Sequence, residues 1–130
     1  MIIDTHILIW LLNDNLERLG REALEIAKTQ SITVSTASLF EIAMKKRKDK
    51  LDAPDTESIY KTLEQQGITV LDIAAQHIYK VPGLAATPHA DPFDLLLMSQ
   101  AISEDLPFLT CDAEILKTVC PGLRLIDGRL

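Results

Sequence analysis

The sequence predicts an α/β protein, a three-layer α/β/α sandwich around a short, mostly parallel sheet. Short apolar segments alternate with helical patterns along the chain, which is typical of a parallel sheet with helical crossovers. The strand-like segments are apolar nearly throughout, as expected when helices cover both faces of the sheet. A length of 130 residues is enough for one domain with a hydrophobic core and too short for two. We therefore expect a single domain over residues 1–130.

The first half of the chain shows two strands and four helices. The strands are expected at residues 1–4 and 31–36, and the helices at residues 5–12, 19–30, 38–48 and 55–67. Leu19, Ala23 and Ile26 recur at helical spacing, and "SITVST" is rich in β-branched residues. Ser38 and Glu41 fit a capping box at the start of the third helix, and Gly67 marks the end of the fourth.

The second half continues the alternation. Its strands are expected at residues 68–73, 107–110 and 123–127, and its helices at residues 74–81, 92–101 and 113–119. Asp91 suits the N-cap of the Leu-rich helix, with Pro92 at the first helical position, and Asp112 suits the N-cap of the last helix. His77 is expected at a helix surface or in packing rather than as a ligand.

Composition and charge exclude several classes of protein. A net charge of −6 argues against binding nucleic acid by bulk electrostatics, although "KKRKDK" at residues 45–50 forms a local basic segment. No cleavable leader is visible, and the longest apolar runs are too short to span a bilayer. Cys111 and Cys120 match no zinc spacing, so we expect reduced thiols and a cytoplasmic protein without membrane contact.

Five acids follow predicted strands or begin predicted helices: Asp4, Glu41, Asp91, Asp94 and Asp112. Taken singly, each can cap a helix. Taken together, they converge on the carboxyl edge of a parallel sheet, where ligands bind in open α/β folds. Their carboxylates would repel one another there, and no Lys or Arg is directly next to any of them in the sequence. Mg²⁺ or Mn²⁺ would balance this charge, so the pattern favours a metal-dependent phosphoryl enzyme.

Four segments resemble one family in order along nearly the whole chain: "MIIDTHILIW", "STASLFEIAMKK", "HADPFDLLLMSQA" and "FLTCD". They resemble the PIN-domain ribonucleases, and most closely the VapC-type toxins of bacterial toxin–antitoxin pairs. The resemblance implies a Mg²⁺- or Mn²⁺-dependent endoribonuclease, a homodimer, and a small VapB-like antitoxin that blocks the site. Carried onto this sequence, the catalytic and metal-binding quartet is Asp4, Glu41, Asp94 and Asp112.

The resemblance also implies supporting residues. Thr5 and Thr110 stand where the family has hydroxyls that orient carboxylates or water, and Asp91 is a further acid of its motif. We assign Asp91 mainly to the helix cap and Asp94 to the metal. The basic segment could bind the RNA backbone through four cations: Lys45, Lys46, Arg47 and Lys48.

Three features depart from the family pattern. Phe40 replaces the usual Trp before the glutamate. Ala90 and Leu95 stand where members often carry Arg, which removes two contacts to phosphate or to the acids. Lys48 or Asp49 replaces a Gly that is often found late in the basic segment.

Two other functions fit an acidic pocket on an α/β fold. A receiver-like module that binds Mg²⁺ and accepts a phosphate needs a paired acid after the first strand and a Lys after a late strand. A small phosphatase needs an Asp-x-Asp motif, whereas this chain has "DTH" after its first strand. The sequence leaves the RNA target open among transfer RNA, ribosomal loops and messenger RNA.

Overall fold

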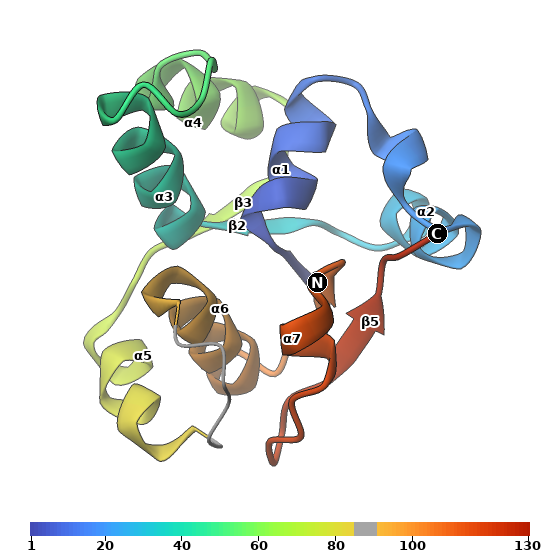
Figure 1. The fold of residues 1–130 in the computed structure, drawn as a ribbon, viewed down its shortest axis with the longest axis vertical. Coiled ribbons are helices and arrows are strands. Elements are labelled where there is room, and N and C mark those ends of the chain that lie inside the picture. Colours follow the sequence, from blue (N-terminus) through green and yellow to red (C-terminus); the bar gives the residue numbers. More distant parts are fainter. Residues whose placement is uncertain (85–90) are drawn as a thin grey trace.

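A five-stranded sheet in the order β3-β2-β1-β4-β5 forms the centre of the fold, and its strands are parallel (Figure 1). The computed structural model describes residues 1–84 and 91–130. The strands are β1 (Ile2–Ile3), β2 (Thr33–Ser35), β3 (Thr69–Leu71), β4 (Phe108–Thr110) and β5 (Leu125–Asp127). The helices are α1 (Thr5–Leu12), α2 (Arg21–Thr29), α3 (Thr36–Arg47), α4 (Thr56–Gln65), α5 (Ala75–Lys80), α6 (Pro92–Ser103) and α7 (Ala113–Leu116), with 3₁₀ turns η1 (Leu16–Arg18) and η2 (Val81–Gly83).

Helices cover both faces of the sheet. Successive residues of a strand point to opposite faces, so each strand contributes apolar side chains to both layers of helices. Ile3, Val34 and Leu109 face one side, where they share a buried apolar cluster with residues of α1 to α4. Ile2 and Phe108 face the other side and pack with buried residues of α6 and α7. These two clusters confirm the expected three-layer α/β/α sandwich.

The order of the strands places β1 at the centre and creates a switch point beside it. The chain moves outward from β1 to β2 and β3, then returns to add β4 and β5 on the other side. In such sheets the loops on either side of the switch point part and leave a crevice at the carboxyl ends of the strands. Asp4 follows β1 at this edge, and Thr110 ends the neighbouring strand β4.

The start of α3 differs from the sequence prediction. Ser35 is the N-cap, and its Oγ accepts a hydrogen bond from the Ala37 amide at 3.0 Å, so the helix begins at Thr36. The expected capping box of Ser38 and Glu41 is therefore wrong. Ser38 lies inside the first turn, where its Oγ instead accepts from Thr5 Oγ1 at 3.0 Å. Glu41 consequently lies in the second turn of α3 rather than the first.

A buried histidine joins α5 to α6. His77 is only 1% exposed, and its Nδ1 accepts a hydrogen bond from the Ala74 amide at 2.9 Å. The proton is then on Nε2, which lies 2.9 Å from Glu104 Oε1. Ser99 Oγ on α6 donates to the His77 carbonyl at 2.5 Å. His77 is thus a buried packing residue, as expected from the sequence.

The structure describes residues 1–84 and 91–130, and this range limits what can be said about two features of the sequence. Ala90, which stands where the family often has Arg, lies outside the described residues. In the part of the chain that is described, no helix is both long and apolar enough to cross a lipid bilayer.

Candidate functional site

Asp4 lies at the junction of β1 and α1 and is almost completely buried, with 3% of its surface exposed. Its Oδ1 accepts from the Ile7 amide at 2.9 Å and so caps α1. Its Oδ2 accepts from Thr110 Oγ1 at 2.5 Å. Burial raises the pKa of Asp4 above the ordinary carboxyl value, and the hydrogen bonds from Thr110 and Ile7 partly offset this rise. A charged Asp4 therefore stands in an environment that favours a neighbouring cation.

Thr110 connects Asp4 to Asp112. While it donates to Asp4, its Oγ1 accepts a hydrogen bond from the Asp112 amide at 3.0 Å. Asp112 is the N-cap of α7, as expected from the sequence, and its Oδ1 accepts from the Glu114 and Ile115 amides. One hydroxyl group thus fixes the relative positions of two acids from opposite ends of the chain.

Glu41 is paired with a cation of its own helix. Its Oε2 lies 3.0 Å from Lys45 Nζ, one helical turn further along α3. The side chain of Glu41 is 10% exposed and that of Lys45 is 34% exposed. The expectation that no Lys or Arg balances the acids is therefore wrong for Glu41. The spacing of four residues on one helix is the signal that could have revealed this pair.

The start of α6 holds the remaining two acids. Asp91 is the N-cap, and its Oδ1 accepts from the Phe93 amide at 2.8 Å and from the Asp94 amide at 3.1 Å. Asp94 lies in the first turn, as expected. The rings of Phe40 and Phe93 meet edge to face with their centroids 5.6 Å apart. This contact links the residue before Glu41 to the residue before Asp94.

The structure thus joins part of the predicted site by direct contacts. Asp4, Thr110 and Asp112 form one hydrogen-bonded chain, and Thr5 bonds to Ser38 on α3. Among residues 1–84 and 91–130, no three His, Cys, Asp or Glu side chains are arranged as a group that could hold a metal ion. The predicted metal ligands, Asp4, Glu41, Asp94 and Asp112, all offer carboxylate oxygens. Hard oxygen ligands of this kind suit Mg²⁺ or Mn²⁺.

The basic segment is partly engaged inside the protein. Lys46 Nζ donates to the Ala53 carbonyl at 2.6 Å, and Lys45 is paired with Glu41. Arg47 and Lys48, at the end of α3, are exposed. Leu95, at a second position where the family often has Arg, lies half-buried on α6.

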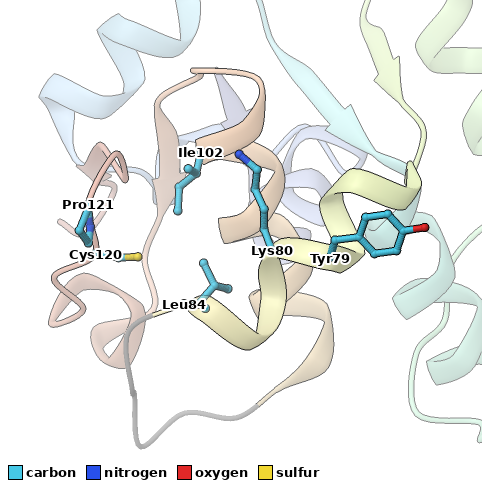
Figure 2. Close-up of a pocket in the computed structure, with 7 residues that line it drawn as sticks. Tyr79, Lys80, Leu84, Ile102, Cys120 and Pro121 are labelled. Carbon is cyan, nitrogen blue, oxygen red and sulfur yellow. The ribbon is translucent and has the colours of Figure 1, made fainter.

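A separate hollow of about 340 Å³ lies between the end of α5, η2, α6 and the segment around Pro121 (Figure 2). It is lined by Tyr79, Lys80, Gly83, Leu84, Ile102, Cys120 and Pro121. None of the predicted site residues contributes to this lining, so the hollow is distinct from the acids at the sheet edge.

Comparison of the sequence with known families gives a match to the PIN domain over residues 1–119. The chain belongs to the PIN domain family. PIN domains are nucleases, so the candidate site of this PIN domain lies in a nuclease fold. No curated protein matches the sequence.

Three solved structures share the fold of this PIN domain at low sequence identity. VapBC2 of Rickettsia felis, bound to a DNA fragment from its promoter, has a TM-score of 0.63 at 21% identity, covering 98% of this chain and 97% of that one. A toxin–antitoxin complex from Klebsiella pneumoniae has a TM-score of 0.63 at 14% identity, with 99% and 98% covered. DNA-bound VapBC of Salmonella typhimurium has a TM-score of 0.62 at 19% identity, with 97% and 96% covered.

Proposed function

We propose that this PIN domain is a VapC-type toxin, a Mg²⁺- or Mn²⁺-dependent endoribonuclease that hydrolyses RNA phosphodiesters. The observation that carries the proposal is the buried carboxylate of Asp4, tied through Thr110 to Asp112 at the carboxyl edge of the central strands. A nuclease fold supplies the reaction class. The structural neighbours from Rickettsia felis and Salmonella typhimurium are VapBC complexes, which supports the toxin assignment.

In this proposal Asp4, Glu41, Asp94 and Asp112 would hold the ion. A divalent cation held there would supply Lewis-acid activation of a water and stabilisation of the leaving oxygen. Thr110 orients the Asp4 carboxylate, and Asp91 fixes the start of α6, the helix that carries Asp94. Thr5 would support the site by joining the start of α1 to α3 through its bond to Ser38. Attack by water on the phosphorus would break its bond to the 3′ oxygen and leave a 5′-phosphate and a 3′-hydroxyl.

The same proposal includes surfaces that bind RNA, an antitoxin and a second copy of the chain. We assign the RNA backbone to the cations at the end of α3, of which Arg47 and Lys48 are exposed. The partner is a VapB-like antitoxin that presents a basic residue to the acids, and the toxin forms a homodimer. Residues 1–130 act as one domain in the cytoplasm, where RNA and antitoxin are both present.

The strand order disfavours the receiver-like alternative. Receiver folds have the order 2-1-3-4-5, whereas this sheet has β3-β2-β1-β4-β5. The phosphatase alternative lacks the second Asp of its motif after β1, where His6 stands instead. Either alternative forms an aspartyl-phosphate, so incubation with a phosphate donor followed by mass spectrometry distinguishes them from a nuclease.

Incubating the purified protein, freed of antitoxin, with total RNA tests the proposal. We expect cleavage in Mg²⁺ or Mn²⁺, none in chelator, and none by Asp4→Asn in either condition. Mapping the new ends should show 5′-phosphates. Cleavage that persists in chelator, or ends with 2′,3′-cyclic phosphates, would contradict the metal-dependent mechanism.

Expression in bacteria without the antitoxin tests the toxin assignment. The wild-type chain should arrest growth, and Asp4→Asn should relieve the arrest while accumulating to the same level. Normal growth with abundant, folded wild-type protein would argue against a toxin.

A further inference from the structure

The ion pair between Lys45 and Glu41 is unlike the other helical Glu–Lys pair at the same spacing. Both pairs are four residues apart, and their nitrogen–oxygen distances are 3.0 Å for Lys45–Glu41 and 3.1 Å for Lys61–Glu57. On α4, Lys61 and Glu57 are 65% and 78% exposed, so water and salt screen their attraction. On α3, Glu41 is largely buried. The Lys45 charge therefore acts on Glu41 with much less screening.

The position of Lys45 leaves it able to move. About a third of its side chain is exposed, so its ammonium group can swing away from Glu41 into solvent. The neighbouring Lys46 is held in place, because its Nζ donates a hydrogen bond to the Ala53 carbonyl in the segment after α3. Lys45 is thus the cation of the basic segment that is both bound to a candidate metal ligand and open to water.

We propose that Lys45 is the internal counter-ion of Glu41 and that it competes with a divalent cation for this carboxylate. The inference rests on the proposed metal site. An ammonium group 3.0 Å from Glu41 Oε2 repels a second cation that approaches the same oxygen. An ion that takes this oxygen must therefore displace Lys45 from it. In the metal-free protein it keeps the buried carboxylate paired, and it weakens the affinity of the site for Mg²⁺ or Mn²⁺.

Lys45→Met separates this role from a merely structural one. Met keeps the length of the apolar stem and removes the charge. We expect the metal-free variant to melt at a lower temperature than wild type, because Glu41 loses its partner. We also expect it to bind Mn²⁺ roughly threefold to tenfold more tightly, because the competitor is gone. A residue that only stabilises α3 would lower the melting temperature without tightening Mn²⁺ binding.

The test is calorimetric titration of chelator-treated proteins with Mn²⁺, together with melting curves in chelator. Lys45→Arg keeps the charge and should bind Mn²⁺ like wild type. Lys61→Met removes the matched exposed pair on α4 and should leave Mn²⁺ affinity unchanged. Equal or weaker Mn²⁺ binding by Lys45→Met, with wild type binding measurably, overturns the competition alone. Absence of Mn²⁺ binding by wild type overturns the proposed metal site and the competition with it.

Discussion

Asp91 and Asp94 are three residues apart at the start of α6, and the backbone gives them different surroundings. Asp91 Oδ1 accepts from two amides of the first turn, which is the work of an N-cap. Asp94 lies inside that turn, next to the phenylalanine that contacts Phe40 beside Glu41. The structure therefore supports the assignment of the cap to Asp91, and the metal role of Asp94 remains our proposal.

Substitutions at the two positions should separate stability from cleavage. Asp91→Asn should keep most of both, because Asn caps a helix about as well as Asp, whereas Asp91→Ala should lower the free energy of unfolding by about 1 kcal/mol. Asp94→Asn should abolish RNA cleavage with little loss of stability. Urea midpoints and turnover for the three variants give the answer. An inactive Asp91→Asn with an active Asp94→Asn would reverse the two roles.

Cys111 should react slowly with alkylating reagents. Burial, and after it the nearby charges of Asp4 and Asp127, raises the pKa of its thiol to about 11. At pH 8 roughly one thiol in a thousand is then ionised, against about a quarter for an unperturbed cysteine. In Cys120→Ser protein kept in chelator, the rate of iodoacetamide labelling should still rise between pH 9 and pH 10.5. A rate that levels off near pH 9 would show an ordinary thiol.

At the scale of elements, α5 is a short helix that depends on α6 for its position. Its buried His77 satisfies the Ala74 amide at the start of α5 and reaches Glu104 beyond the end of α6. Ser99 adds a bond from the middle of α6 to the His77 carbonyl. The His77 side chain is 1% exposed whereas that of Glu104 is 35% exposed, so losing the imidazole chiefly leaves the Ala74 amide without its partner.

His77→Ala should therefore lower the free energy of unfolding by about 2 kcal/mol and increase amide exchange in α5. Gln76→Ala, at an exposed position of the same helix, is the control and should change stability by less than about 0.5 kcal/mol. Urea unfolding and hydrogen exchange measure both variants. Unchanged exchange in α5 of the His77 variant would mean that its apolar contacts alone hold the helix.

At the scale of the whole molecule, an ion bound only by the folded protein adds stability by mass action. The melting temperature of wild type should rise with Mn²⁺, and the rise should shrink in Asp4→Asn. In chelator, Asp4→Asn should be the more stable protein, because it removes a buried charge while Asn can still cap α1. Differential scanning calorimetry measures all four conditions. Equal melting of wild type with and without Mn²⁺ would contradict the proposed site.

The sequence predicted the layers of the fold because strand and helix periodicities are local signals. The order of the strands was not predictable, since it depends on which apolar faces meet in the folded chain. Ser38 shows the same limit within the site. Its spacing to Glu41 fits a cap, yet its hydroxyl binds Thr5 from α1 and the cap falls to Ser35. The sequence indicates Lys45 only as an RNA contact, because its pairing with Glu41 depends on how deeply that side of α3 is buried.

The bond between Asp4 and Thr110 joins residues that are 106 positions apart, and this separation has a consequence during synthesis. Ribosomes release the N-terminal end first, so Asp4 emerges long before its partner strand exists. A chain that stops short of Phe108 has neither β4 nor the hydroxyl that fixes Asp4, and it also lacks Asp112. The proposed toxin would then gain its activity only after Asp112 has been translated, and chains terminated before that residue would be harmless to the cell that makes them.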